Sequence, residues 1–256
     1  MIGESVARIH LTGGLQVEGP NGVAVDSDFP GTQGRLAFVA LILERHPLSH
    51  DVLANLLWPE SPPKEWNSAL AAVMSKIRSL LLRIGLDGRE MVKASNGAYA
   101  IALPGGSWVD VEDAYTRLDR AEGAYRSKDP ARAITDATVA SAILRRPLLE
   151  GVFSDWILAR RQEQQEALLR CLGLLARAWI DSGNLELAAV IAESAIKIDP
   201  FREVNHRLLM EAEWNRNDRG ASLRAFARCE QLLADELNVK PSSETLSLAD
   251  LIRQTG

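Results

Sequence analysis

The chain has 256 residues, enough for one large or two ordinary domains, and 46% of them are hydrophobic, so we expect a buried core. Its formal net charge of −5 at pH 7 argues against a protein that coats nucleic acid indiscriminately, although a local basic patch would still allow specific DNA binding. No apolar run approaches the roughly 20 residues that span a bilayer, and the opening residues lack the pattern of a secretory signal. We therefore expect a cytoplasmic protein that makes no membrane contact.

Three short apolar-rich runs open the chain, at 8–11, 15–17 and 23–25. Glycine-rich turns separate them, and Gly and Asn supply the positive φ that tight turns need, so the runs predict a small meander of strands. A buried helix is predicted over 35–45, which is apolar nearly all round, and Pro47 ends it. Ser49 is then placed to cap a second helix, 51–57.

A third helix is predicted over 64–84, after a stiff connection with three prolines. Gly85 lies just past its end, where a C-terminal cap belongs. Two β-like runs, 91–94 and 98–103, then flank an Asn-Gly pair, which predicts a hairpin. Strands, three helices and a hairpin, in this order, are typical of a winged helix. The apolar positions of the third helix recur at spacings of three and four: Leu70, Val73, Met74, Ile77, Leu80, Leu81 and Ile84.

Beyond a Pro-Gly-Gly-Ser segment at 104–107, which we interpret as a linker, the chain is predicted to be almost entirely helical. The turn and helix at 183–188 recur loosely at 218–223, close to the 34-residue period of tetratricopeptide hairpins. The predicted fold class is therefore α+β, with an N-terminal winged helix followed by an all-α tetratricopeptide-like domain. We expect the first domain to span 1–104 and the second to span 105–256. The expected helices of the second domain are 110–127, 131–145, 156–182, 185–198, 201–216 and 219–237.

The third helix has the charge pattern of a DNA-reading element. Between Trp66 and Ile84 it carries three basic residues and no acidic one. A helix in the major groove needs one face anchored in the core and another that offers hydrogen-bonding groups to bases and Lys or Arg to phosphates. Taken alone, the pattern also fits an ordinary amphipathic helix with a solvated basic face. The candidate contacts on this helix are Asn67, Ser68, Ser75, Lys76, Arg78 and Ser79.

The predicted hairpin favours the DNA-binding interpretation, because a wing is a second point of contact with the duplex. Its tip and flank carry Lys93, Ser95 and Asn96, which we take as candidate contacts. Arg35, at the start of the first helix, is a further candidate for holding a phosphate, and a plain surface arginine fits it equally well.

The order of these motifs resembles the SARP-type activators, a family named for regulators of antibiotic pathways. The resemblance begins with Leu56-Leu57-Trp58, continues through the acidic, proline-rich turn at 60–63, and includes Asn67 and Ser75-Lys76-Ile77-Arg78. The Gly97-Ala98-Tyr99 segment is similar to the family's wing. The second half resembles the bacterial transcriptional activation domain, on these pieces: Trp156 with Arg160-Arg161, Asp199-Pro200-Phe201, Arg207 to Met210, and LADELNVKPS at 233–242.

This resemblance implies an activator with an OmpR-type winged helix that binds double-stranded promoter DNA at short direct repeats and recruits RNA polymerase. Two repeats would require two copies of the chain on the DNA, as a homodimer at least there. The sequence departs from the family at the wing, where Ala94-Ser95-Asn96 replace the usual Arg and Pro, and after Arg78, where Ser79 and Leu80 follow. Both departures bear on the DNA sequence that is read and not on the fold.

Two other function classes remain open. The first is an enzyme, but the chain has no H-E-x-x-H, P-loop, G-x-G-x-x-G or G-x-S-x-G motif, and none of His10, His46, His50 and His206 pairs with a cysteine at metal-ligand spacing. We expect no catalysis, metal or cofactor, and we interpret Cys171 and Cys229 as buried thiols. The second is a tetratricopeptide scaffold that binds only protein and carries a degenerate winged helix.

Overall fold

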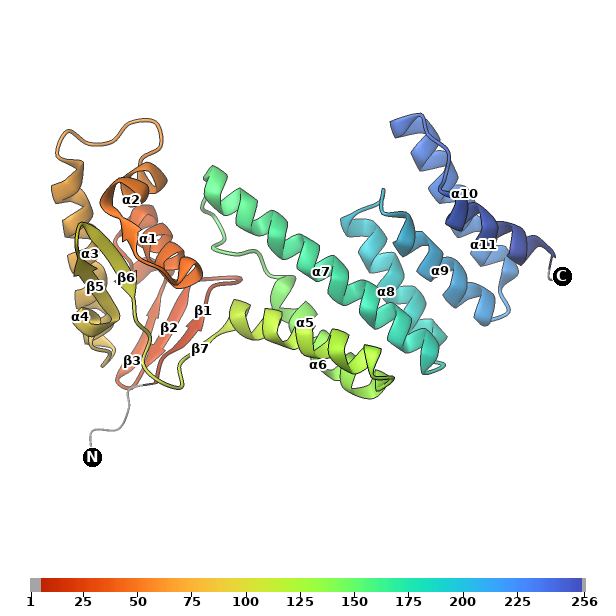
Figure 1. Cartoon of the computed structure of the whole chain (residues 1–256), viewed down its shortest axis with the longest axis horizontal. Helices are drawn as coiled ribbons and strands as arrows, with labels where there is room; N and C mark the ends of the chain where they lie inside the picture. Colours follow the sequence, from red (N-terminus) through yellow and green to blue (C-terminus); the bar gives the residue numbers. More distant parts are fainter. Residues whose placement is uncertain (1–5, 255–256) are drawn as a thin grey trace. The chain divides into compact units, whose positions relative to one another are not determined.

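The computed structural model describes residues 6–254, which divide into two compact units. One unit holds the described residues up to 113 together with 146–164, and the other holds 114–145 and the described residues from 165 onwards. Figure 1 shows that the strands lie in the first unit and that the second is helical. None of the helices within 6–254 has the length and apolar character needed to cross a membrane.

The first unit opens with a four-stranded sheet in the order β3-β2-β1-β7. Strands β1 (Arg8–His10), β2 (Gln16–Gly19) and β3 (Gly22–Val25) form the predicted antiparallel meander. Strand β7 (Trp108–Val109) pairs in parallel with β1 and is absent from the sequence prediction, because two residues carry no periodicity. Each meander strand buries an apolar side chain, namely Ile9, Val17 and Ala24.

Helices then cover the middle of this unit. Helix α1 is buried along most of its length, as the all-round apolar pattern predicts. Ser49 caps α2 as predicted, since its hydroxyl accepts a hydrogen bond from the Val52 amide at 3.2 Å. A short strand before α2 joins the wing in a second sheet, of order β4-β6-β5. The bounds are η1 (Asp26–Asp28), α1 (Gly31–Glu44), β4 (Leu48–Ser49), α2 (His50–Leu57), α3 (Trp66–Arg83), α4 (Gly88–Met91), β5 (Val92–Ser95) and β6 (Ala98–Ile101).

Helix α3 ends in the glycine cap that the sequence predicts. Gly85 has a φ of 82°, a left-handed conformation that glycine adopts without steric cost. Its amide donates to the Leu82 carbonyl, and the next amide, of Leu86, donates to the Leu81 carbonyl, both at 3.0 Å. These two bonds satisfy carbonyls that the helix end would otherwise leave unpaired, which is the Schellman arrangement.

The segment interpreted as a linker is a short turn that leads into β7. The Ser107 hydroxyl accepts a hydrogen bond from the Ala7 amide at 3.1 Å, and the Trp108 amide donates to the Ala7 carbonyl at 2.9 Å. Asp110 follows, fully buried, and its carboxylate accepts from the Leu11 amide and from both the amide and the hydroxyl of Thr12. The start of the helix at 110 is thereby fixed to the end of β1.

Residues 146–164 return to the same unit. The Leu149 amide donates to the Leu11 carbonyl at 2.9 Å, and the Trp156 indole donates to Glu44 at 3.0 Å. Arg160 also pairs with Glu44 at 2.6 Å. The sequence prediction misses these contacts because they join positions more than 100 residues apart.

The second unit is a stack of helices whose turns repeat one local structure. Asp129, Asn184 and Asp218 each accept a hydrogen bond from the amide three residues on. They cap the starts of α6, α8 and α10 in turn. The predicted helical repetition is therefore confirmed. The bounds are α5 (Asp110–Arg126), α6 (Pro130–Leu144), α7 (Asp155–Asp181), α8 (Leu185–Ile198), α9 (Glu203–Asn215), α10 (Arg219–Leu237) and α11 (Ser243–Gln254).

Alanine and leucine side chains fill the interior of this stack, in clusters that join α5–α8 and α8–α11. Cys171 and Cys229 are both free and buried, as predicted, and burial raises their pKa values to about 12 and about 11. Helix α11 is absent from the sequence prediction. It lies past Pro241 and packs Ala249 and Ile252 into the core.

Candidate nucleic-acid interface

Helix α3 has the two faces that the sequence predicts. Most of the apolar stripe is buried, with Leu70, Met74 and Ile77 completely removed from solvent, while Val73 is half-buried. The opposite face is exposed and polar. It carries the predicted contacts Asn67, Ser68, Ser75, Lys76 and Ser79.

The first turn of α3 is open to a ligand at its amide groups. Glu65 occupies the N-cap position, but its side chain makes no capping hydrogen bond. The free amides and the positive end of the helix dipole favour a negatively charged group such as a phosphate. Asn67 and Ser68 lie in this same turn, so the predicted contacts and the free amides coincide.

Lys76 is the exposed cation in the middle of this face. Within residues 6–254 it makes no ion pair and no side-chain hydrogen bond. Ser79, one turn later, donates its hydroxyl to the Ser75 carbonyl at 3.0 Å, so its oxygen remains available as an acceptor. An unpaired ammonium beside short hydroxyl side chains can approach a phosphate without first breaking an internal ion pair.

Arg78 has a different position from the other candidates. Its Nε donates to the Val92 carbonyl at 2.9 Å, and its guanidinium lies 5.8 Å from the centre of the Tyr99 ring. The side chain therefore ties α3 to the first and second strands of the wing. A direct contact of Arg78 with DNA stays a prediction, and the structure adds a positioning role that the sequence does not reveal.

The wing has the turn that its Asn-Gly pair predicts. Asn96 and Gly97 both have positive φ, 50° and 72°, which is the type I′ geometry of a two-residue hairpin. The Gly97 carbonyl accepts from the His50 amide at 2.9 Å, so the tip is anchored to the start of α2. Ser95 and Asn96 are exposed.

Two predicted contacts have partners inside the protein. Lys93 lies 3.4 Å from the Glu90 carboxylate, and a phosphate would compete with that ion pair. Arg35 lies 3.4 Å from Asp26 and 3.4 Å from the Thr32 hydroxyl. Its polar contacts are thus with the η1–α1 region and not with α3 or the wing, so the structure does not bring Arg35 into the cluster formed by the other candidates.

Arg89, which lies in the short helix α4, is absent from the contacts predicted from the sequence. Together with Ser75, Arg78 and Ser79 it lines a hollow of about 390 Å³ beside α3. Gly88 makes this close approach possible, because a Cβ there would lie 2.2 Å from the Arg78 carbonyl oxygen. Asp87, whose carboxylate accepts from the amides of Arg89 and Glu90, is the local signal that marks the start of α4.

Within residues 6–254 no group of three or more His, Cys, Asp or Glu side chains is placed to hold a metal ion. His206 is buried, and one ring nitrogen contacts the Pro200 carbonyl at 2.8 Å.

The sequence of this chain is similar to those of known transcriptional regulators. The sequence profile of the bacterial transcriptional activator domain matches residues 109–253. The regulatory protein AfsR of Streptomyces coelicolor is 27% identical over 230 residues, which are 87% of this chain and 22% of AfsR. The transcriptional regulatory protein EmbR of Mycobacterium tuberculosis is 27% identical over 252 residues, which are 94% of this chain and 62% of EmbR. The chain thus spans about a fifth of the first relative and less than two thirds of the second.

The fold has a close match among solved structures. EmbR of Mycobacterium tuberculosis, solved in complex with a low-affinity phosphopeptide, superposes with a TM-score of 0.90 at 22% identity. The match covers 99% of this chain and 66% of the EmbR chain. It confirms the predicted fold class, a small sheet and winged helix followed by tetratricopeptide-like helices.

Proposed function

Because this chain belongs to the bacterial transcriptional activator domain family of SARP-type regulators, we propose that it activates transcription by binding promoter DNA at direct repeats and recruiting RNA polymerase. The single observation that carries the DNA-binding part is the exposed face of α3, which is polar, free of acidic residues and adjacent to an anchored wing. We assign DNA binding to residues 1–104 and activation to residues 105–256, in the cytoplasm.

In this proposal α3 lies in the major groove with its first turn deepest. Asn67 and Ser68 contact base edges or phosphates near the uncapped amides. Ser75, Lys76 and Ser79 follow along the groove, and Lys76 neutralises a phosphate. The buried stripe with Leu70 at its start holds the helix in this orientation.

The wing supplies the second contact. Ser95 and Asn96 at the tip, and Lys93 on the flank, approach the backbone of the neighbouring groove. Arg78 fixes the wing against α3 through the Val92 carbonyl and thereby sets the spacing of the two contacts. Arg89 adds a cation beside the same helix, and Arg35 holds a phosphate only by leaving Asp26.

A scaffold that binds only protein is the second candidate, and one observation favours it. The exposed face of α3 contains Ala71 and Ala72 between the polar groups, and its wing lysine is paired with Glu90. Such a face offers fewer charges to DNA than phosphate recognition usually employs.

Selection of bound genomic fragments separates the two candidates. The full chain is mixed with fragments of the genome that encodes it, and the retained DNA is sequenced. We expect one enriched motif that occurs as two direct repeats upstream of genes, and we expect a reporter with one repeat deleted to lose activation. Retention of no specific sequence would contradict the activator proposal and leave the scaffold.

A further inference from the structure

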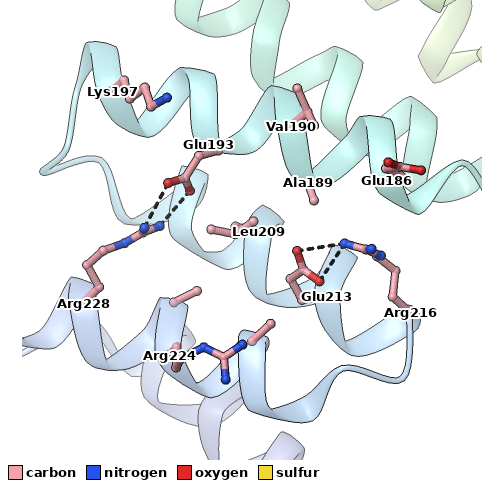
Figure 2. Close-up of a pocket in the computed structure, with 12 residues that line it drawn as sticks. Glu186, Ala189, Val190, Glu193, Lys197, Leu209, Glu213, Arg216, Arg224 and Arg228 are labelled. Atoms are coloured by element: carbon pink, nitrogen blue, oxygen red, sulfur yellow. Dashed lines mark hydrogen bonds and ion pairs between the residues drawn. The ribbon is translucent and has the colours of Figure 1, made fainter.

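The helical unit contains an open groove that DNA binding does not use. It has a volume of about 670 Å³ and is lined by α8, α9 and α10. Figure 2 shows Leu209 in its floor, with Ala189 and Val190 on the α8 side. Val190 is 61% exposed although it is apolar, so the groove presents a hydrophobic surface to solvent.

The charged side chains around this groove are unevenly paired. Arg228 and Glu193 form a two-bond ion pair at 2.7 and 2.9 Å, and Arg216 bonds Glu213, as the dashed lines in Figure 2 mark. In contrast, two further lining cations have no ion pair or side-chain hydrogen bond within residues 6–254. These two are Lys197 and Arg224.

The groove therefore suits a segment with an apolar side chain and carboxylates beside it. The lining also holds three carboxylates, on Glu186, Glu193 and Glu213, so charges of both signs alternate around the groove, which suits separate carboxylates of a peptide better than a continuous row of phosphates. The carboxylates of a peptide can contact the two unpaired cations one at a time while its apolar side chain covers Val190 and Leu209.

The chain itself carries such a segment, in the other unit, at 150–155. Phe153 is 79% exposed, the most exposed of the large hydrophobic side chains in the described chain. Glu150 and Asp155 flank it, are both exposed, and have no ion pair within residues 6–254. The apolar side chain of this loop matches the apolar surface of the groove. The two carboxylates of the loop are opposite in charge to the two unpaired cations of the groove.

This segment is also held in a fixed conformation. Leu149 and Val152 are buried beneath it, and Arg161 donates to the Leu148 and Leu149 carbonyls at 2.8 and 2.7 Å. A segment that is already ordered loses little conformational entropy when it binds. An exposed aromatic side chain on a rigid loop is the kind of residue that dominates protein interfaces.

We propose that the 150–155 loop of one copy binds in the α8–α10 groove of a second copy. Phe153 packs on Val190 and Leu209, and Glu150 and Asp155 pair with Arg224 and Lys197. The two surfaces differ, so the contact is heterologous and joins copies head to tail. Copies related in this way can follow one another along a direct repeat, but the contact itself does not depend on the proposed DNA binding.

Sedimentation velocity of the full chain tests this contact. Concentrations from roughly 1 to 200 µM are needed because a contact made by one short loop is weak. The weight-average mass of the wild type should rise with concentration. Phe153→Ala and Arg224→Glu should each weaken association by about tenfold or more. The matched controls are Phe201→Ala, an exposed phenylalanine outside the loop and groove, and Arg132→Glu, an exposed arginine on α6; both should associate like the wild type.

Mixing the two interface variants gives the sharpest result. Phe153→Ala retains an intact groove and Arg224→Glu retains an intact loop, so together they form one complete contact. We expect the mixture to associate more strongly than either variant does alone. A wild type that stays monomeric, a Phe153→Ala variant that associates normally, or a mixture that stays monomeric would each overturn the proposal. None of these outcomes bears on DNA binding, which the fragment selection tests separately.

Discussion

The exposed face of α3 carries no carboxylate, whereas the outer faces of the helical unit carry charges of both signs. In the helical unit, arginines pair with carboxylates on neighbouring helices, as Arg170 does with Glu122 and Arg177 with Glu211. On α3, Lys76 has no partner within residues 6–254, and Arg83 lies 3.9 Å from Asp28, at the limit of an ion pair.

This difference separates charges that hold a fold together from charges that are available to a ligand. A paired arginine must give up its carboxylate before it contacts a phosphate, whereas an unpaired lysine loses only water. Many arginines of the helical stack are paired in this way, whereas the exposed face of α3 carries no carboxylate that could pair with Lys76.

The buried face of α3 should give the largest effect. Leu70→Ala removes a side chain with no solvent exposure, so we expect the free energy of unfolding to fall by about 2–5 kcal/mol through lost burial and a cavity. Chemical denaturation measures this change. The control is Leu82→Ala on the same helix, whose side chain is 69% exposed and whose removal should alter stability little. Equal stability of the two variants would contradict the assignment of the faces.

Arg78 should show a mixed effect, because it is half-buried and tied to the wing. Arg78→Ala should lower stability by about 1 kcal/mol through loss of the hydrogen bond to the Val92 carbonyl. DNA affinity should fall further than stability alone explains, since the wing loses its support. Arg78→Lys keeps the charge but not the rigid planar donor group, and it should also weaken binding. Normal affinity of Arg78→Lys would show that charge, and not the wing, matters here.

Lys76→Ala should weaken DNA binding several-fold at low salt and leave the melting temperature unchanged, because the side chain has no partner in the described structure. Fluorescence anisotropy with the selected DNA measures the affinity. Lys240→Ala removes another exposed lysine, in the helical unit, and should have no effect. An equal loss in both variants would mean that α3 is not the contact surface.

The smallest effect concerns pH and the helical unit alone. Burial lowers the pKa of His206 below its ordinary 6.5, and its hydrogen bond with the Pro200 carbonyl opposes this only in part. The unfolded chain therefore takes up a proton more readily, and stability present above about 6.5 is lost as pH falls through that value. Denaturation of His206→Gln between pH 7.5 and about 5.5 should show a shallower loss than the wild type. Parallel curves would place the pH dependence elsewhere.

Local signals predict the parts of this molecule that form locally. Gly85 and the Asn96-Gly97 pair lie at the expected turns, because positive φ is a property of single residues. The periodicity of α3 predicts its buried face because residues three and four apart lie on the same side of a helix. The α4 helix is missed because its four residues are too few for a periodic pattern.

Long-range contacts explain the remaining differences. Asp110 suits a helix start from its sequence, yet it is bound to the end of β1, about a hundred residues away. From the sequence alone, Arg78 is as good a candidate for a DNA contact as Ser75. Only the structure shows that its side chain is bound to the wing. Pairing of Lys93 with Glu90 and of Arg35 with Asp26 likewise depends on side-chain placement that spacing does not reveal.

Binding of DNA by α3 and its wing through phosphate contacts is tested most directly by the salt dependence of the affinity. For the full chain on its selected site, the logarithm of affinity should fall linearly with the logarithm of salt concentration, by about 0.9 for each phosphate neutralised. The double variant Lys76→Ala/Lys93→Ala should then have a slope shallower by about 1.8. An unchanged slope in the double variant, or binding that does not depend on salt, would show that these lysines do not contact phosphates.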